Sequence, residues 1–362
     1  MSPRVRERVS SSSLASSAAL APDVGRFGSA LFMDIVVITP ARPASRSGNR
    51  TTAVRWAKLF RRLGHSARIA TEYDGTPADL MVALHAWRSA GAVERFRKLH
   101  PDRPLVVGLS GTDLYEYIDR HPQPTLRSLE TADRLVALQD LARRRIPARL
   151  RGKLRVIHQS APPLPRHGVR ASRTFDVAVI AHLRKVKDPL RAAKAARLMP
   201  GASRLRIVHV GGADTAQWAK RAKAEMQANS RYVWRGEISR AAVRRLLGRS
   251  RALVLSSVSE GGANVVSEAV AAGVPVLASH IDGSVGLLGE DYPGYFPVGD
   301  TATLARLLHR IETEPSFLGR LRGAVARRRE LFKPAREIAA WKTLLDELAR
   351  PSAARKRRRP RQ

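Results

Sequence analysis

Residues 260–268 read Glu-Gly-Gly-Ala-Asn-Val-Val-Ser-Glu, so two carboxylates flank a glycine-rich turn with seven residues between them. The apolar run 252–255 precedes this stretch, and a helical pattern begins at Val265. A strand, a glycine turn and a helix in this order are typical of a parallel α/β unit, in which ligands bind beyond the carboxyl end of the strand. The stretch therefore predicts an α/β fold and a ligand-binding loop.

The same stretch has the features of a site for a nucleotide-linked sugar. Its glycines let a backbone approach a ligand closely, and the free amides at the helix start attract a diphosphate. Glu268 lies far enough into the helix to reach ribose hydroxyls, while Glu260 stays at the mouth, beside the sugar. A solvated turn followed by an ordinary surface glutamate is the alternative. The residues expected to bind the donor here are Gly261, Gly262, Ala263, Asn264, Val265 and Glu268.

Short apolar runs alternate with amphipathic helical patterns along almost the whole chain, which predicts parallel sheets covered by helices. In the first half, strands are expected at 34–39, 67–70, 80–84, 105–109, 135–137 and 154–158, and helices at 49–63, 90–99 and 139–145. The pattern then restarts, with strands at 175–180, 205–210, 231–234, 252–255 and 275–278 and helices at 188–198, 214–229, 239–247 and 265–272. We therefore expect two Rossmann-like domains that face each other across a cleft.

The restart of the pattern suggests the domain boundaries. We expect an N-terminal acceptor domain over 33–160 and a C-terminal donor domain over 172–332, with the proline-containing stretch 159–173 as the linker. Further helices are expected at 301–312, 316–331 and 335–349, and the last of them should cross back to the N-terminal domain.

The two ends of the chain have a different composition. Residues 1–32 are rich in serine, alanine and arginine and are expected to be disordered or to reflect a mis-assigned start, and 350–362 is expected to be a disordered basic tail. The sequence has no apolar stretch long enough to span a bilayer. The lack of cysteine excludes disulfides and thiol nucleophiles and fits a reducing compartment, so we expect a cytoplasmic protein.

The formal net charge of +34 over 362 residues invites comparison with nucleic-acid-binding proteins. The arginines, however, are spread through every helical segment, and none of the common nucleic-acid-binding motifs appears. We therefore expect no nucleic-acid partner and keep a non-catalytic nucleic-acid-binding protein as the second alternative. A positive cleft would also gather anionic substrates.

A second group of polar residues follows the first strand of the second half. Residues 182–189 read His-Leu-Arg-Lys-Val-Lys-Asp-Pro, and Asp188 and Pro189 are expected to start the next helix. Arg184 and Lys187 would lie at the same sheet edge as the glutamate loop, where cations can neutralise a diphosphate leaving group without a metal. A surface basic loop in an arginine-rich chain is the alternative.

Together the two motifs resemble the donor site of retaining glycosyltransferases with the GT-B fold, a family of enzymes with two Rossmann-like domains. Members carry a glutamate pair at this spacing, and an arginine and a lysine on the earlier loop. Lys187 falls on the lysine position, but His182 occupies the arginine position, so we expect Arg184 to supply the missing cation. The resemblance implies catalytic roles for Lys187, Arg184 and Glu260, donor binding by His182 and Glu268, and no metal or cofactor.

The first half of the sequence points to a more specific family. It contains distinctive segments at 39–42, 47–53, 55–57, 63–65, 84–89 and 109–115. With the basic loop, these segments are similar to the selenosugar synthase family of selenoneine biosynthesis, over about residues 34–341. That family implies that selenophosphate displaces UDP from UDP-N-acetylglucosamine or UDP-glucose and forms a carbon–selenium bond. It also implies coupling to a selenophosphate synthetase and a selenoneine-forming enzyme.

An acceptor of this kind needs a site that holds an anion. The loop between the first strand and its helix could bind an oxyanion through helix amides and a guanidinium, or it could simply be a turn and helix cap. The residues concerned are Ser47, Gly48, Asn49, Arg50 and Thr51.

Other polar residues at strand ends are weaker candidates. His85 stands where related enzymes often place a histidine near the reacting sugar, and it could also be an ordinary buried histidine. Thr112 and Asp113 follow a strand and are expected to cap a helix or to line the acceptor site. Residues 158–160 could face the acceptor. Trp87, Trp234 and Trp341 are expected to be packing residues.

The first alternative function is transfer of a hexose from a UDP-sugar to a hydroxyl of a lipid, a glycan or a small molecule. Such a reaction would need a general base or a substrate-assisted route, and an apolar acceptor groove would favour it. The sequence alone does not decide which sugar is preferred or whether the anomeric configuration is retained.

Overall fold

The computed structural model describes residues 32–45, 47–164 and 173–350. The predictions for residues 1–31, for the linker residues 165–172 and for 351–362 fall outside these ranges. Within the described ranges, none of the helices is both long enough and apolar enough to cross a membrane.

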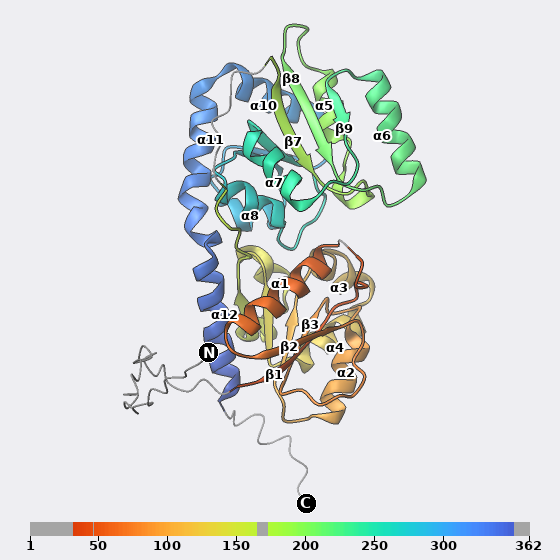
Figure 1. Ribbon diagram of the computed structural model, residues 1–362, viewed down its shortest axis with the longest axis vertical. Coiled ribbons are helices and arrows are strands. Elements are labelled where there is room, and N and C mark those ends of the chain that lie inside the picture. The colour runs from red at the N-terminus through yellow and green to blue at the C-terminus, as the bar shows by residue number, and fades with distance from the viewer. Residues whose placement is uncertain (1–31, 46, 165–172, 351–362) are drawn as a thin grey trace, which may run out of the picture. The chain divides into compact units, whose positions relative to one another are not determined.

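The first half forms a parallel six-stranded sheet with the order β2-β1-β3-β4-β5-β6 (Figure 1). Its strands are β1 (Asp34–Ile38), β2 (Ser66–Ala70), β3 (Leu80–Leu84), β4 (Leu105–Gly108), β5 (Arg134–Ala137) and β6 (Leu154–Val156). Its α-helices are α1 (Gly48–Arg62), α2 (Ala90–Leu99), α3 (Ile118–Arg120) and α4 (Pro122–Thr131). A π-helical turn, Asp113–Tyr117, follows β4, and 3-10 turns lie at Asp140–Arg145 and Ala148–Lys153.

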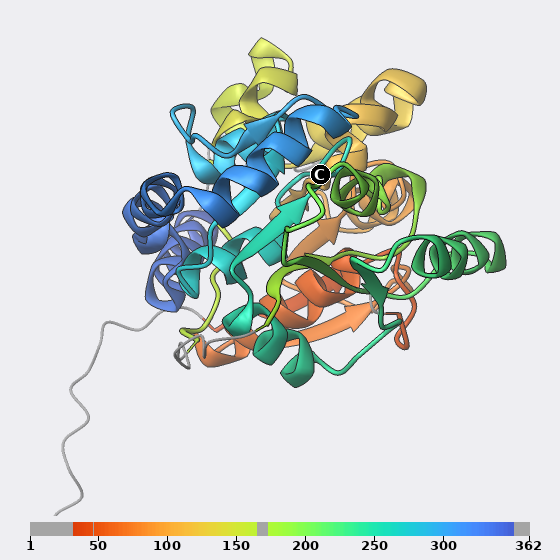
Figure 2. The ribbon, with the colours of Figure 1, turned by 90° about the horizontal axis from the view of Figure 1, so that it is seen from above.

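The second half repeats this plan, with the strand order β12-β11-β10-β7-β8-β9 and helices around the strands (Figure 2). Its strands are β7 (Phe175–Ile180), β8 (Leu205–Val210), β9 (Tyr232–Trp234), β10 (Ala252–Leu255), β11 (Val276–Ser279) and β12 (Tyr295–Phe296). Its helices are α5 (Arg191–Arg197), α6 (Ala216–Ala228), α7 (Arg240–Arg249), α8 (Asn264–Ala271), α9 (Asp282–Leu288), α10 (Thr301–Thr313) and α11 (Pro315–Arg328). The two six-stranded parallel sheets confirm the predicted pair of Rossmann-like domains.

The strands are apolar throughout because both faces of each sheet are covered. All five residues of β3 are buried. Alternate residues of β3 belong to different hydrophobic cores, on opposite faces of the sheet. Leu80 and Val82 pack with α1, whereas Met81 and Ala83 pack with α2 and α4. A parallel sheet covered on both faces requires such continuous apolar runs, which is why the sequence pattern located these strands.

The last helix, α12 (Pro334–Ala349), packs on the first sheet, beside α1 (Figure 1). Trp341 is fully buried, and its ring centroid lies 4.7 Å from that of Trp56 and 4.9 Å from that of Phe60. Edge-to-face contacts of this kind add to the free energy gained by burying the rings. The prediction that Trp341 is a packing residue is confirmed.

The loop before α5 differs from the prediction. Helix α5 begins at Arg191 rather than at Asp188. Asp188 has the left-handed backbone conformation φ 40°, ψ 57°, and Pro189 follows it within a turn. A residue before proline avoids the right-handed helical region, and aspartate tolerates the left-handed one better than most residues do. The expected helix start at Asp188-Pro189 was therefore wrong.

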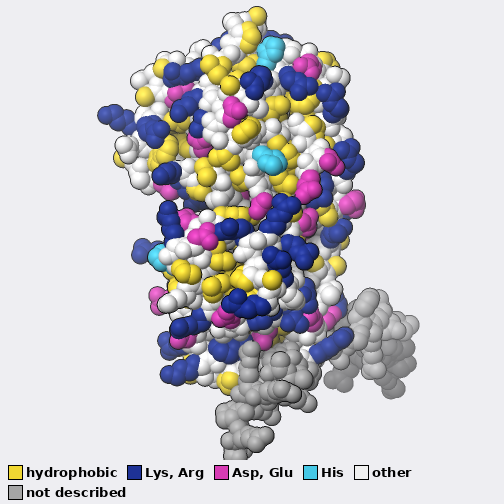
Figure 3. Space-filling view, turned by 180° about the vertical axis from the view of Figure 1, so that it is seen from behind, with side chains coloured by type: hydrophobic (Ala, Val, Ile, Leu, Met, Phe, Trp, Pro, Cys, Tyr) yellow, Lys and Arg dark blue, Asp and Glu magenta, His cyan; other side chains and the backbone are white. Residues whose placement is uncertain are grey.

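Basic side chains are dispersed over the face shown in Figure 3, among acidic and apolar side chains. Several arginines form ion pairs, for example Arg206 with Asp176 at 2.7 Å and Arg97 with Asp133 at 2.8 Å. Dispersed, partly neutralised charge differs from the continuous basic stripe that nucleic-acid-binding surfaces present.

Helix α12 is also fixed by a buried polar cluster. The Glu337 carboxylate, 2 % exposed, accepts hydrogen bonds from Arg55 Nε at 3.0 Å and from Ser160 Oγ at 2.6 Å. The Ser160 amide donates to the same carboxylate at 2.9 Å. Glu337 thus joins α12 to α1 and to the segment that leaves the first sheet.

Replacing Glu337 by glutamine is expected to lower the free energy of unfolding by about 2 kcal/mol, because Arg55 would lose its charged partner in a mostly buried position. Urea unfolding at neutral pH measures this change. The matched control is Asp346→Asn on the same helix, where the exposed Lys342–Asp346 pair should contribute less than about 0.5 kcal/mol. Equal losses in the two variants would contradict a structural role of the buried cluster.

Candidate active site

Two loops at the carboxyl edge of the second sheet are hydrogen-bonded to each other. They follow β7 and β10, which are neighbours in the sheet. The amide of Val258 donates to the carbonyl of Val186 at 2.8 Å, and Ser256 Oγ lies 2.9 Å from the carbonyl oxygen of Asp188. The basic loop and the glutamate loop therefore form one surface.

Lys187 and Glu260 meet on this surface. The Lys187 ammonium forms an ion pair with the Glu260 carboxylate, which also accepts a hydrogen bond from Ser257 Oγ at 2.5 Å. The side chains of Lys187 and Glu260 are only 17 % and 9 % exposed. The structure thus brings together two residues that the sequence assigned to separate motifs.

A cavity of about 1090 Å³ is lined by both halves of the chain, including His182 from the basic loop and Glu268 from α8. Lys187 and Glu260 themselves are not among its lining residues. From the second half it is lined by His182, Gly211, Glu237, Arg240, Asn264 and Glu268, among others. From the first half, the residues include Arg50, Thr51, Val54, Arg55, Lys58 and Arg62 on α1, with Ser160, and Glu337 on α12. A cavity of this size can hold a nucleotide-linked sugar.

Glu268 projects into the cavity from α8. Its carboxylate lies 3.9 Å from the Arg240 guanidinium. Burial raises the pKa of Glu268 above the ordinary glutamate value, against the opposing effects of Arg240, Arg244 and Arg55. Among the residues that the structure describes, this loose ion pair is the one polar contact of the Glu268 carboxylate, so its burial is poorly compensated.

Two further polar atoms in this region are buried without a hydrogen-bond partner among the described residues: Asn264 Oδ1 and Arg184 Nε. Asn264 is the first residue of α8 and lines the cavity. Buried polar atoms in folded proteins are usually hydrogen-bonded, so unpaired ones beside a cavity indicate atoms that a ligand can satisfy. The expected contribution of Arg184 remains a prediction.

Glycines allow the loops to approach each other closely. Gly111, after β4, packs on the glutamate loop, and a β-carbon at Gly111 would lie 2.5 Å from the Gly261 amide nitrogen. Gly211 has a φ of 146°, and a β-carbon there would clash with the Ala181 carbonyl. Neither contact was predicted from the sequence, because no local pattern separates these two glycines from the others.

Only some residues of the expected acceptor loop line the cavity. Ser47 caps α1 by accepting a hydrogen bond from the Arg50 amide at 3.4 Å, as the turn-and-cap alternative predicts. Gly48 and Asn49 begin the helix and do not line the cavity, whereas Arg50 and Thr51 do. An anion-binding role is therefore better supported for the last two residues.

Of residues 158–160, only Ser160 lines the cavity. Gln159 instead donates to Thr52 Oγ1 at 2.8 Å, and His158 lies 3.4 Å from the carboxylate of Asp140.

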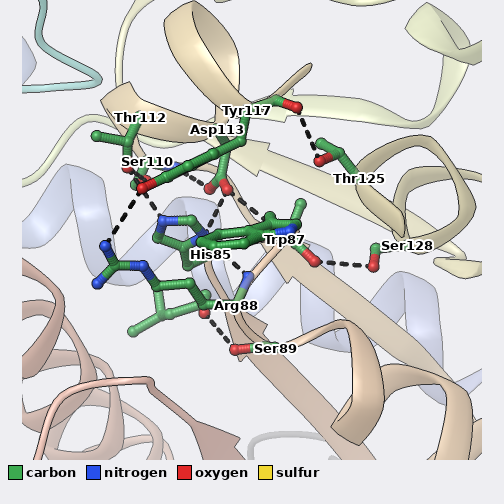
Figure 4. A network of polar contacts seen from close by, with 12 residues as sticks. His85, Trp87, Arg88, Ser89, Ser110, Thr112, Asp113, Tyr117, Thr125 and Ser128 are labelled. Atoms are coloured by element: carbon green, nitrogen blue, oxygen red, sulfur yellow. Dashed lines mark hydrogen bonds and ion pairs between the residues drawn. The ribbon is translucent and has the colours of Figure 1, made fainter. Parts of the chain in front are cut away.

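His85 lies outside the cavity, in a buried polar network at the carboxyl edge of the first sheet (Figure 4). It is 1 % exposed, and its Nδ1 lies 2.6 Å from Asp113 Oδ1. Its backbone has a φ of 76°, unusual for a residue with a side chain. Trp87 stacks on Tyr117 and His121, with centroid distances of 4.1 and 4.6 Å, as expected for a packing residue.

Sequence reasoning missed several cavity residues. Arg55 and Glu337 come from α1 and α12, Glu237 lies between β9 and α7, and Arg240 is the first residue of α7. Arg55 belongs to the distinctive segment 55–57 but was not expected at the site, and the other three belong to no motif identified in the sequence. The expectation that no metal is required stays a prediction; the described residues contain no group of three or more metal-ligating side chains.

His209 does not line the cavity but is hydrogen-bonded to Ala181, which does. It is fully buried on β8, with Nε2 at 2.9 Å from the Ala181 carbonyl oxygen and Nδ1 at 2.9 Å from the Tyr232 hydroxyl. Burial lowers its pKa to about 4, so the ring is neutral at physiological pH. Through Ala181, it fixes the strand end that carries His182.

The depressed pKa predicts a stability change in mild acid. Between pH 6.5 and 4 the unfolded chain binds a proton at His209 that the folded chain does not, so the free energy of unfolding falls as the pH falls. Urea unfolding of His209→Gln should show a loss between pH 7 and pH 5 that is about 2 kcal/mol smaller than that of the unsubstituted protein. An identical pH dependence would contradict a neutral buried ring.

Comparison with known proteins agrees with this architecture. Residues 165–328 match the family Glycosyl transferases group 1. No curated protein matches the chain by sequence. Among solved structures, HepE from Anabaena in complex with UDP superposes with a TM-score of 0.68 at 16 % identity, covering 88 % of this chain and 100 % of that one.

Two further structures have the same fold. Sucrose-phosphate synthase from Thermosynechococcus elongatus has a TM-score of 0.72 at 16 % identity, with 87 % of this chain and 98 % of that one covered. A glycosyltransferase from Rickettsia africae has a TM-score of 0.66 at 14 % identity, with 89 % and 100 % covered. Residues 165–328 thus resemble the glycosyl transferases group 1 family, and the chain as a whole has the GT-B fold of these solved structures.

Proposed function

We propose that the protein transfers the sugar of a UDP-sugar to a small anionic acceptor, without a metal. The Lys187–Glu260 ion pair carries this proposal, because it joins the two loops whose neighbouring residues His182 and Glu268 line the cavity. HepE, which shares the fold, was crystallised with UDP and with UDP-glucose, which supports a UDP-linked donor. In this arrangement, Glu268 binds the ribose, Lys187 and Arg184 neutralise the departing UDP, and Glu260 orients the sugar.

The acceptor that we propose is selenophosphate. The resemblance to selenosugar synthases suggests it. The cavity is lined by the cations Arg50, Arg55, Lys58, Arg62 and Arg240 and by the carboxylates Glu237, Glu268 and Glu337, and this excess of positive charge supports an anionic second substrate. A small acceptor that is already nucleophilic must be held in place more than deprotonated.

The reaction would proceed by displacement at the sugar. The selenium lone pair forms the bond to the anomeric carbon, and the bond from that carbon to the UDP oxygen breaks with its electron pair leaving on UDP. Water then cleaves the phosphorus–selenium bond, which releases phosphate and the selenosugar. A selenophosphate synthetase would supply the acceptor, and a selenoneine-forming enzyme would consume the product.

The decisive experiment is an anaerobic assay of UDP release from UDP-N-acetylglucosamine and UDP-glucose, with selenophosphate generated in place and mass analysis of the products. A selenium-containing sugar formed only in the presence of selenophosphate is expected. Intact donor, despite demonstrated UDP binding, would instead point to another acceptor.

One observation favours transfer to a hydroxyl-bearing acceptor as the second candidate. Apolar side chains of Val54, Leu59, Ile238 and Ile338 also line the cavity, and selenophosphate alone would leave them without a partner. A hexose transferred to an amphipathic lipid or small molecule, in an assay that lacks selenophosphate, would establish this alternative.

A further inference from the structure

Four side chains form a continuous polar chain at the carboxyl edge of the first sheet (Figure 4). Asp113 Oδ1 lies 2.6 Å from His85 Nδ1, and His85 Nε2 lies 3.0 Å from Thr112 Oγ1. Thr112 Oγ1 lies 3.2 Å from Ser110 Oγ. His85 and Asp113 are 1 % exposed, whereas Ser110 and Thr112 are half-buried. The chain thus leads from a buried carboxylate to a partly exposed hydroxyl.

The geometry places a proton on His85 Nδ1. A carboxylate only accepts hydrogen bonds, and Asp113 also accepts from the amides of Ser110 at 2.9 Å and Trp87 at 3.3 Å. If Nδ1 carried no proton, two acceptors would face each other at 2.6 Å. The Arg88 amide also lies within hydrogen-bond distance of Nδ1, at 3.2 Å, and competes with Asp113 for this nitrogen. The shorter contact, 2.6 Å to Asp113, favours a proton on Nδ1.

This proton fixes the donor and the acceptor in each hydrogen bond of the series from Asp113 to Ser110. We take His85 as the neutral imidazole with its proton on Nδ1, in which Nε2 is an acceptor and Thr112 donates its hydroxyl proton to it. Thr112 Oγ1 can then only accept from Ser110, which uses the one proton of the Ser110 hydroxyl. The outer lone pairs of Ser110 Oγ remain, and the hydrogen bonds of the described residues include no donor to them.

Ser110 does not line the cavity, but it is next in sequence to a residue that contacts the glutamate loop, where the proposed function places the sugar. The neighbouring Gly111 packs directly on the glutamate loop, and a β-carbon there would lie 3.1 Å from the Glu260 α-carbon. The left-handed backbone of His85 supports the same conclusion, since such strain persists mainly where function requires it.

We infer that Ser110 is a specificity-determining residue that accepts a hydrogen bond from one hydroxyl of the donor hexose, with Asp113, His85 and Thr112 as the positioning residues that leave it only lone pairs to offer. This inference rests on the proposed UDP-sugar donor. It differs from the sequence-based expectation that Thr112 and Asp113 bind an acceptor phosphate, because a chain that presents lone pairs repels an anion.

The test measures donor binding without any acceptor. Dissociation constants of UDP-glucose and of UDP are compared for the unsubstituted protein, Ser110→Ala and Asp113→Asn. Ser110→Ala should weaken UDP-glucose binding about tenfold and leave UDP binding unchanged, the loss of one hydrogen bond with a desolvated hydroxyl. Asp113→Asn should do the same, because an amide that donates to Nδ1 moves the ring proton to Nε2 and reverses the chain.

Deoxyfluoro analogues of UDP-glucose identify the hydroxyl that is recognised, because fluorine cannot donate. One analogue should bind the unsubstituted protein about tenfold more weakly than UDP-glucose, and Ser110→Ala should weaken that analogue no further. Ser128→Ala is the matched control, because the Ser128 hydroxyl donates to the Ala86 carbonyl at 2.8 Å and takes no part in the hydrogen bonds from Asp113 to Ser110.

Unchanged UDP-glucose affinity in Ser110→Ala, or an equal loss for UDP and UDP-glucose, would overturn the inference. So would tighter binding of inorganic phosphate to the unsubstituted protein than to Ser110→Ala, because that result means that Ser110 binds an anion. If the unsubstituted protein binds neither UDP nor UDP-glucose, the proposed donor itself is wrong, which is a separate result.

Discussion

Replacing Lys187 by alanine is expected to reduce sugar transfer about 10²- to 10³-fold, the loss seen when one preorganised group that stabilises developing charge is removed. Lys187 is held by its ion pair with Glu260, so its ammonium is in place before UDP leaves. UDP release measured at saturating donor would show the decrease in kcat, and thermal unfolding would report the state of the fold.

Two control variants separate chemistry from stability. Lys185→Ala removes an exposed cation from the same loop and should leave turnover unchanged. Lys187→Ala leaves the Glu260 carboxylate buried without its ion pair, so part of the loss could come from local destabilisation. The double variant Lys187→Ala/Glu260→Gln should recover stability without recovering turnover. If Lys187→Ala and Lys185→Ala had equal turnover, Lys187 would not act on the leaving group.

The strands were predictable because they are buried on both faces. The segments 80–84, 175–180, 205–210 and 252–255 are strands at the predicted bounds. Elements that do not depend on continuous apolar runs were harder to find. Helix α4, Pro122–Thr131, has the polar sequence PQPTLRSLET, and only its packing through Thr125, Ser128 and Leu129 makes it a helix.

The candidate site was predictable where it depends on neighbouring strands. Lys187 and Glu260 are far apart in the chain, but each follows a strand of one parallel sheet, and those strands are adjacent. Contacts set by packing between layers leave no such local signal. The pair of Arg55 with Glu337 and the contact of Gly111 with Gly261 each join segments that no motif connects.

The cost of burying Glu268 illustrates why function and stability differ at this site. Burial raises its pKa in the folded protein, so the ionised carboxylate destabilises the fold at neutral pH, and this destabilisation is relieved as the pH falls. Glu268→Gln should therefore be at least as stable as the unsubstituted protein at pH 7, in thermal unfolding. A carboxylate that costs stability in this position agrees with a role in binding, here the proposed ribose contact.

The same Glu268→Gln variant is expected to bind UDP and UDP-sugar about 10- to 100-fold more weakly, because a carboxylate accepts hydrogen bonds from two ribose hydroxyls and an amide accepts fewer. In the unsubstituted protein, the affinity for UDP should fall as the pH drops, and the fall should begin above the pH at which an ordinary glutamate titrates, since the pKa of Glu268 is raised. Isothermal titration calorimetry from pH 7.5 to pH 5 measures both effects. UDP itself ionises in part of this range, so the two proteins are compared at each pH. A ratio of affinities that stays constant with pH would contradict the assignment, because only the Glu268 carboxylate distinguishes them.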